Sequence, residues 1–164
     1  MISLKKAIFS DLETIEVIQR KSFKMWYEKY HDESNPYLET RASIEEKFNR
    51  PMSTYYLIQD GDQVIGYLRM QTNIEETEIW LAIVAVLPEY QRKGYASSAI
   101  KLLEESYSSI KKWDLCTIFQ EKSLVKLYEK CGYQATHTEL LQEGMDLVFM
   151  TKVITSVKSS DLRE

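Results

Sequence analysis

The sequence predicts an α+β fold of three layers, in which a mixed, mostly antiparallel, twisted sheet carries helices on both faces. Two strand-like segments flank Asp60-Gly61-Asp62, which has the composition of a hairpin turn and begins an antiparallel meander. The apolar strand 79–86 ends at a turn, and an amphipathic helix begins after Gly94, as in a parallel strand-helix-strand unit. The expected strands, about six to seven in all, are drawn from residues 3–9, 54–59, 63–72, 79–86, 113–119, 133–141 and 145–152.

Length and composition indicate one domain. A chain of 164 residues with 44% hydrophobic and 28% charged residues is long enough to bury one core. We expect this domain to span residues 1–153, and the polar residues 154–164 to form a loose tail.

Charge and residue usage exclude several classes of function. The net charge of -4 disfavours a general nucleic-acid binder, whose affinity would come from phosphate contacts. No segment has the length of a membrane span and the amino terminus lacks a signal peptide, so we expect a cytoplasmic protein with no membrane partner. Two cysteines and two histidines are too few and too scattered for a metal site.

Capping boxes predict two helices in the first half of the chain. Ser10-Asp-Leu-Glu13 begins a helix that fades near Ser22, and Ser43-Ile-Glu-Glu46 begins a shorter one that ends before Pro51. Residues 23–37, between these helices, are rich in aromatic side chains. They pack on the core, line a binding cleft, or do both.

The turn after strand 79–86 is a candidate anion site. Gly94 permits backbone angles closed to other residues, Ala96 leaves room for close approach, and Arg92 and Lys93 add positive charge. The first amides of the following helix point outward at the positive end of its dipole, where a phosphate or pyrophosphate binds. The competing interpretation is a surface turn with two solvated cations.

The remaining elements complete a crossover unit and a hairpin. The helix after Gly94 leads to strand 113–119 in a right-handed crossover, with the anion site at the carboxyl end of its first strand. A further helix near residues 121–131 stops at Gly132, which suits a left-handed cap. The closing hairpin is exposed enough to pair with a second copy, so a homodimer is possible.

Two short motifs resemble those of the GNAT superfamily of N-acetyltransferases. Gln91-Arg-Lys-Gly-Tyr-Ala96 is similar to its Q/R-x-x-G-x-G/A signature, and Leu127-Tyr-Glu-Lys-Cys-Gly-Tyr133 to its L-Y-x-x-x-G-F segment. They occur in the order and on the elements that the family requires. The resemblance covers about residues 3–152 and implies a GNAT-like sheet.

The resemblance implies acetyl-CoA as cosubstrate, bound where strand 79–86 and the strand after the helix diverge. The pantetheine arm pairs with the main chain of 84–86, and the pyrophosphate lies on the amides of 91–96, so mainly backbone donors are used. The implied cofactor-binding residues are Val84, Ala85, Val86, Gln91, Arg92, Lys93, Gly94, Tyr95, Ala96, Ser97 and Tyr128.

The implied chemistry is direct transfer of an acetyl group from the thioester to a primary amine. Tyr128 stands where the family has the tyrosine that protonates the CoA sulfur; its periodicity alone is also typical of a core tyrosine. The base is less clear, since Trp80 and Cys116 stand where other members carry a glutamate. Glu78, acting through water, is the candidate, although a solvated strand-end carboxylate fits it equally. Glu121 replaces a common cofactor-binding asparagine, which puts that contact in doubt.

The acceptor is expected to be an amine-bearing small molecule or peptide, entering opposite the cofactor between segment 23–37 and the strands around 67–71 and 139–146. The candidate substrate-binding residues are Trp26, Tyr27, Tyr30 and Arg69. Two other functions remain open: a non-catalytic acyl-CoA-binding regulatory or interaction module, and a nucleotide-phosphate binder. The second lacks the glycine and lysine pattern of known phosphate loops.

Overall fold

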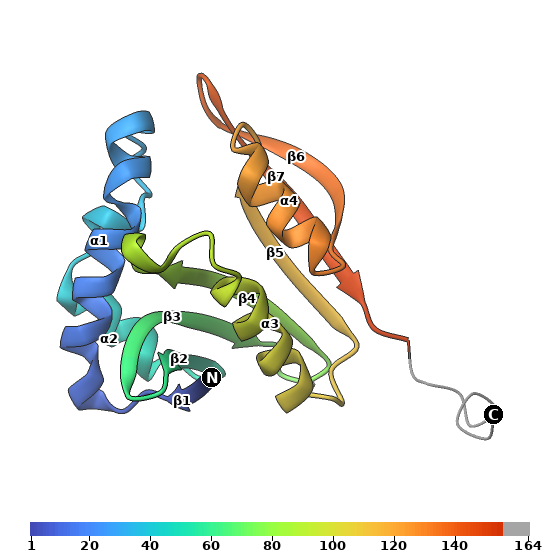
Figure 1. The fold of residues 1–164 in the computed structure, drawn as a ribbon. Helices are drawn as coiled ribbons and strands as arrows, with labels where there is room; N and C mark the ends of the chain where they lie inside the picture. The colour runs from blue at the N-terminus through green and yellow to red at the C-terminus, as the bar shows by residue number, and fades with distance from the viewer. Residues whose placement is uncertain (156–164) are drawn as a thin grey trace.

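The computed structural model describes residues 1–155, which form one seven-stranded sheet (Figure 1). In the sheet the strands follow the order β1-β2-β3-β4-β5-β7-β6. Their bounds are β1 Ile2–Lys6, β2 Ser53–Asp60, β3 Gln63–Thr72, β4 Glu78–Val86, β5 Lys112–Ile118, β6 Gln134–Gln142 and β7 Met145–Val153. All neighbouring strands are antiparallel except β4 and β5, so the predicted mixed, mostly antiparallel sheet is confirmed.

Four α-helices cover the two faces of the sheet. They are α1 Leu12–Tyr30, α2 Arg41–Asn49, α3 Tyr95–Ser106 and α4 Lys122–Lys130, with short 3-10 helices η1 Phe9–Asp11, η2 Pro36–Leu38 and η3 Pro88–Tyr90. Apolar side chains of α1 and α2 form one buried cluster with β2 and β3, and those of α3 and α4 form a second on the other face. This is the predicted three-layer arrangement. Within residues 1–155 no helix has the length and apolar character needed to cross a bilayer.

The first helix is longer than the sequence predicted. It does not fade near Ser22 but continues to Tyr30 and ends at His31, whose φ of 53° is left-handed. Ser22 is buried and its hydroxyl donates to the Val86 carbonyl at 3.2 Å, so its polarity serves a tertiary contact instead of a helix end.

The predicted caps of the first two helices are also wrong. Ser10 makes no capping bond; instead the Ile8 amide donates to Asp11 Oδ2 at 2.9 Å, which begins η1 one turn ahead of α1. The second helix begins at Arg41 because the Thr40 hydroxyl accepts from the Ser43 amide at 3.2 Å, which makes Thr40 the cap. The expected first strand, 3–9, ends at Lys6 because η1 begins at Phe9.

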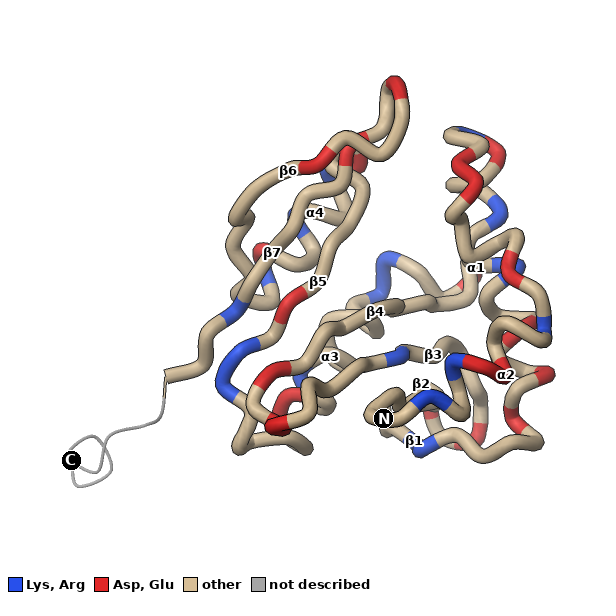
Figure 2. The backbone as a smooth tube through the Cα atoms, turned by 180° about the vertical axis from the view of Figure 1, so that it is seen from behind, with Lys and Arg blue, Asp and Glu red and all other residues tan. Residues whose placement is uncertain are grey.

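Strands β4 and β5 pair over a short stretch and then separate. Only Glu78, Ile79 and Trp80 have partners on β5, at residues 112–114. Figures 1 and 2, seen from opposite sides, both show β4 and β5 diverging beyond this point. A bulge at the β3–β4 pairing, where Arg69 faces Ile83 and Met70 faces Leu81, lies just beyond the paired stretch. The divergence that the family resemblance implied is confirmed.

Gly66 lets β3 approach the backbone of β4 closely. A Cβ built on Gly66 meets the Ala85 carbonyl oxygen at 2.2 Å, a distance that no real side chain tolerates. The carboxyl half of β4, which borders the divergence, is therefore held by a contact that only glycine allows.

Gly66→Ala should lower the free energy of unfolding by about 3 kcal/mol, because β4 must shift to admit the methyl group. Gly61→Ala in the same hairpin is the matched control: its φ of +61° is strained but its Cβ meets nothing within 4 Å, so about 1 kcal/mol is expected. Urea unfolding measures both. Equal losses for the two variants would contradict the close approach.

Candidate active site

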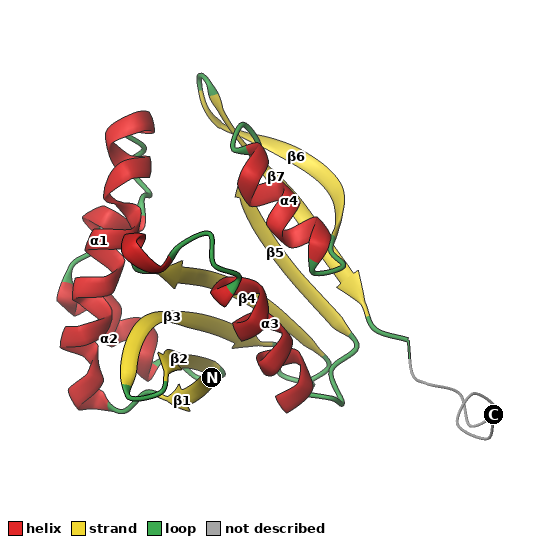
Figure 3. Ribbon diagram, viewed as in Figure 1, coloured by secondary structure: helices red, strands yellow, loops and turns green. Residues whose placement is uncertain are grey.

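The turn from β4 to α3 presents bare backbone donors to a cavity. Arg92 has a φ of 63° and Gly94 a φ of 82°, so the chain twice takes left-handed angles before α3 begins at Tyr95. No side chain caps this helix, and its first amides keep their hydrogens free for a ligand. Figure 3 shows the turn as η3 followed by an open loop that leads into α3. Such an arrangement binds anions.

This turn-side cavity, of about 240 Å³, extends from the turn to the carboxyl half of β4 and the inner face of α4. Its wall includes most of the predicted cofactor residues, namely Val84, Ala85, Val86, Gln91, Arg92, Gly94, Tyr95, Ala96 and Tyr128. Lys93 and Ser97 do not line it: Lys93 is exposed, and the Ser97 hydroxyl donates to the Gly94 carbonyl at 3.0 Å. The cofactor roles of these residues stay a prediction that their placement favours.

The open edge of β4 carries unpaired main-chain groups. The Leu87 amide donates to Ile65 on the β3 side at 2.8 Å, so strand alternation turns the amides of Val84 and Val86 toward the open edge. The Val86 carbonyl on that edge accepts from Ser22 and, at 2.9 Å, from Gln91 Nε2. Gln91 therefore ties the turn to the strand through its side chain, a role the sequence did not predict.

Tyr128 stands between two cavities. It is 9% exposed, belongs to the buried cluster of α3 and α4, and lines both the turn-side cavity and a second one. Burial, followed by the nearby Cys131 and Cys116 thiols, raises the pKa of Tyr128 well above its ordinary value. Its hydroxyl therefore keeps its proton at neutral pH. Tyr128 is therefore a core residue by its packing and, at the same time, part of the wall of both cavities.

The second, hairpin-side cavity has a volume of about 270 Å³ and opens toward the β6–β7 hairpin. It is lined by β4, β5, the hairpin residues Leu141 and Met145, and the segment that follows α1. Five residues line both cavities: Phe23, Trp26, Val84, Leu124 and Tyr128. The two cavities therefore meet beside Val84, where β4 has separated from β5.

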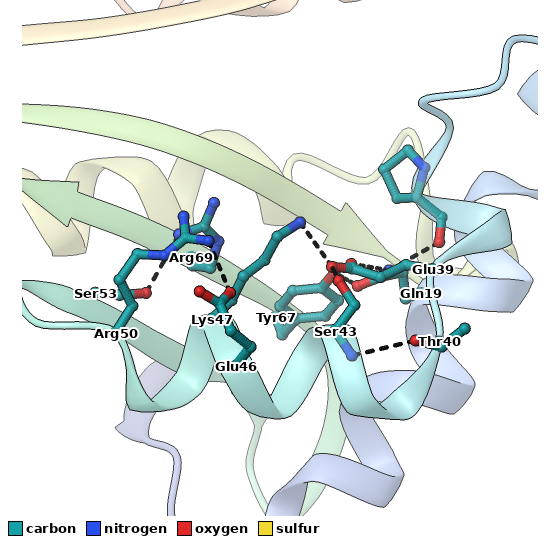
Figure 4. Close-up of polar contacts among 11 residues, drawn as sticks. Gln19, Glu39, Thr40, Ser43, Glu46, Lys47, Arg50, Ser53, Tyr67 and Arg69 are labelled. Carbon is teal, nitrogen blue, oxygen red and sulfur yellow. Dashed lines mark hydrogen bonds and ion pairs between the residues drawn. The ribbon is translucent and has the colours of Figure 1, made fainter.

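Of the predicted substrate-binding residues, only Trp26 lines a cavity. Tyr27 stacks on Tyr37 with ring centroids 5.2 Å apart, and the Tyr30 hydroxyl donates to Glu121. Arg69 is buried beneath α2, where its guanidinium donates to Ser53 at 3.2 Å (Figure 4). The bulge and the pleat of β3 turn Arg69 away from the divergence, which residue spacing alone did not reveal.

Glu78 lies at the closed end of the divergence. Lys112 approaches its carboxylate at 3.1 Å, and neither cavity is lined by this residue. The role of Glu78 as a base stays a prediction, and its placement gives that role no support.

Glu121 closes the far end of the site and does not face the turn. Lys29 donates to its carboxylate at 2.5 Å and the Tyr30 hydroxyl is a second donor. Burial opposes ionisation of this carboxyl group, but the two hydrogen bonds outweigh it and hold the pKa of Glu121 below its ordinary value. The end of α1 is thus tied across the divergence to the start of α4.

A buried polar network holds the segment after α1 in place (Figure 4). Gln19 donates to the Pro36 carbonyl at 2.8 Å and to Glu39 at 2.7 Å, and accepts from the Tyr67 hydroxyl. Lys47 pairs with Glu39 at 2.6 Å. Sequence reasoning missed this segment as a site element because its side chains, among them a buried Asp32 that lines the hairpin-side cavity, match no motif.

Residues 14–133 match the family model described as Acetyltransferase (GNAT) family. The chain belongs to the GNAT acetyltransferase family. Members of this family use acetyl-CoA as cosubstrate, and this GNAT chain is an acetyl-CoA-dependent N-acetyltransferase. A comparison with curated proteins gave no match.

Solved structures share the fold at low sequence identity. A spermidine N-acetyltransferase from Vibrio cholerae, in complex with CoA and spermine, is 21% identical with a TM-score of 0.74, over 93% of this chain and 95% of that one. The ribosomal-protein-S18-alanine N-acetyltransferase from Escherichia coli is 15% identical with a TM-score of 0.76, over 97% of each chain. PaiA N-acetyltransferase from Thermoplasma acidophilum, in complex with coenzyme A, is 19% identical with a TM-score of 0.75, over 93% and 99%.

The geometry of this GNAT chain fits a diphosphate-bearing cosubstrate. The Cβ position of Gly94 meets nothing within 4 Å, so the backbone of the turn is open to close approach by a ligand. Within residues 1–155 there is no cluster of three or more side chains suited to hold a metal ion. The positive charge at the turn comes from Arg92, which lines the cavity, and from the helix dipole.

Gly94→Leu should weaken CoA binding at least about tenfold, because the side chain enters the space in front of the turn amides and the φ of +82° strains it. Gly144→Leu is a matched control: its φ of +80° is equally strained and its Cβ position equally open, but it lies in the β6–β7 turn. Isothermal titration with CoA measures both. Unchanged affinity in Gly94→Leu would place the diphosphate elsewhere.

Proposed function

We propose that this acetyltransferase moves an acetyl group from acetyl-CoA to a primary amine of a small molecule or peptide by direct attack. The observation that carries the proposal is the meeting of two cavities at Val84 and Tyr128. The turn-side cavity suits the cosubstrate, and the hairpin-side cavity suits the acceptor, which approaches from the opposite side. Direct attack needs this arrangement because both substrates must be present together.

Bound acetyl-CoA supplies the acetyl group as a thioester. The Val84 and Val86 amides on the open edge of β4 are placed to hold the pantetheine arm, and a donor at Val84 can stabilise charge on the carbonyl oxygen. Such preorganised backbone donors require no particular side chains. This accounts for a cofactor site built mainly from the turn and strand backbones.

Tyr128 is proposed to protonate the sulfur that leaves as the amine attacks. A tyrosine phenol carries its proton at neutral pH, and Tyr128 lines both cavities where they meet, which is where the thioester bond breaks in this proposal. The nitrogen of the neutral acceptor forms the new bond to carbon, the carbon–sulfur bond breaks, and the sulfur takes the phenolic proton. The nitrogen gives up one proton to solvent as the amide forms, and a proton from solvent returns the Tyr128 phenolate to the phenol. The amine must arrive unprotonated or lose its proton in the cavity.

Amine acceptors fit the described solved structures. One neighbour is named a spermidine N-acetyltransferase and another a ribosomal-protein-alanine N-acetyltransferase, so both a small amine and a protein amine occur as acceptors on this fold. For the present chain, the cytoplasmic location and the homodimer stay predictions.

Tyr128→Phe should lower kcat about 100-fold and leave CoA affinity nearly unchanged, because only the proton donor is removed. Thiol release from acetyl-CoA in the presence of a panel of primary amines measures the rate, and titration with CoA measures the affinity.

Tyr27→Phe serves as the control for this variant, since Tyr27 packs on Tyr37 and lines neither cavity. Its rate should equal that of the wild type. A wild-type rate in Tyr128→Phe would remove Tyr128 from the chemistry, and absence of thiol release from the wild type with every amine would reject the transferase proposal.

A further inference from the structure

We propose that Asp32 binds a positively charged group of the acceptor, at a distance from the amine that is acetylated. The inference rests on the proposed function and narrows the acceptor to a class: primary amines that carry a second cationic group, joined to the first by an apolar spacer. Four features of the hairpin-side cavity lead to it.

The first feature is a buried carboxylate without a cation. Asp32 is 4% exposed and lines the hairpin-side cavity. Its Oδ1 accepts from Asn35 Nδ2 at 3.1 Å; within residues 1–155 the carboxylate has no other hydrogen-bond donor and no ion-pair partner. A buried carboxylate that lacks a cation is costly, and an ammonium group in the cavity would offset that cost.

The second feature is the absence of competing charge. Among the described residues, Asp32 is the only charged side chain on the wall of the hairpin-side cavity. Lys29, near the end of α1, is paired with Glu121 at 2.5 Å. Most of the wall is apolar and includes Leu81, Ile83, Leu115, Ile118, Leu141 and Met145. The surroundings of Asp32 therefore suit an apolar spacer that ends in a cation.

The third feature is the position of Asp32 relative to the junction. Asp32, in the segment that follows α1, does not line the turn-side cavity, whereas Trp26 on α1 lines both cavities. A cation at Asp32 is thus held apart from an amine at the junction, so the two groups of the acceptor must be joined by a spacer.

The fourth feature is the rigidity of the carboxylate. The Asn35 side-chain oxygen accepts from the Tyr37 amide at 2.8 Å, which fixes its amide nitrogen toward Asp32. The Gln19 bond to the Pro36 carbonyl holds the same segment from below. A preorganised carboxylate loses little entropy when it binds a cation.

Acidic side chains of the β6–β7 hairpin, which lines the cavity through Leu141 and Met145, add a longer-range attraction for a cation. Glu139 lies on β6 and Glu143 in the turn between β6 and β7, a hairpin on which Figure 2 shows acidic positions. These side chains are exposed, so they contribute to the encounter with a cation more than to its final affinity.

Three primary amines with the same five-carbon chain test whether the charge of the second group matters: 1,5-diaminopentane, 5-amino-1-pentanol and pentylamine. The second group is a cation in the first, a neutral hydroxyl in the second and absent in the third. Wild-type protein should acetylate the diamine with a kcat/KM at least about tenfold above the two monoamines, mainly through a lower KM. In Asp32→Asn this preference should fall to within about twofold. Glu33→Gln, an exposed neighbour that lines neither cavity, should keep the wild-type preference.

A second measurement does not depend on turnover. With protein saturated by CoA, calorimetric titration should give a lower Kd for 1,5-diaminopentane than for pentylamine, and Asp32→Asn should remove the difference. CoA affinity and thermal melting of the variant establish that it is folded.

The outcomes separate the two proposals. Turnover with a diamine preference that survives Asp32→Asn overturns the Asp32 proposal and leaves the transferase function intact. An equal loss with all three amines also overturns it, because Asp32 would then act on the reacting amine or on the fold. Release of no thiol with any amine rejects the proposed function, and the Asp32 proposal with it.

Discussion

The parallel pairing of β4 and β5 stops after three residues on each strand, and the site depends on this early stop. A longer pairing would consume the amides on the open edge of β4 and would close both cavities. The bulge just beyond the paired residues redirects β4, and Gly66 keeps the diverging half of that strand against β3. The sheet thus remains continuous on one side of β4 and is open on the other.

Beyond the paired residues, contacts between α1, α4 and the closing hairpin hold the two parts of the sheet together across the divergence of β4 and β5. The ion pair of Lys29 with Glu121 at 2.5 Å, together with the bond from Gln142 to the Tyr30 carbonyl at 2.7 Å, joins the end of α1 to α4 and to the closing hairpin. These contacts bound the hairpin-side cavity without filling it. The residue that the family motif would make a cofactor contact, Glu121, has a structural task here instead.

Sequence reasoning predicted the fold class correctly, and most of the residues it assigned to the cofactor line one cavity, although their cofactor roles stay a prediction. Strand and helix periods predict the meander, the crossover unit and the closing hairpin, but not the position of β7 between β5 and β6. The turn after β4 has a distinctive set of small and basic residues around Gly94. The length of α1 was missed because no residue between Ser22 and Tyr30 breaks a helix, and the polar Ser22 proved to be buried. The predicted caps were wrong because Asp11 and Thr40 accept the capping hydrogen bonds that the pattern assigned to Ser10 and Ser43.

The hairpin-side cavity, which we propose for the acceptor, could not be read from the sequence because single residues that match no motif line it. Arg69 and Tyr27 were plausible by residue type, but the pleat of β3 and the rotation of α1 turn them into packing contacts. The proposal for Asp32 rests on its burial beside a cavity whose wall comes from α1, the segment after it, β4, β5, α4 and the closing hairpin. Substrate pockets vary on a shared fold for this reason.

Amide hydrogen exchange at Val84, Val86 and the first turn of α3, with and without CoA, tests the central claim most directly. Open-edge amides should exchange rapidly in the free protein and become protected when CoA binds, while the amides of β4 that pair with β3 stay protected throughout. Protection of Val84 and Val86 in the free protein, or exchange that CoA leaves unchanged, would contradict the claim that the divergence of β4 and β5 forms the cosubstrate site.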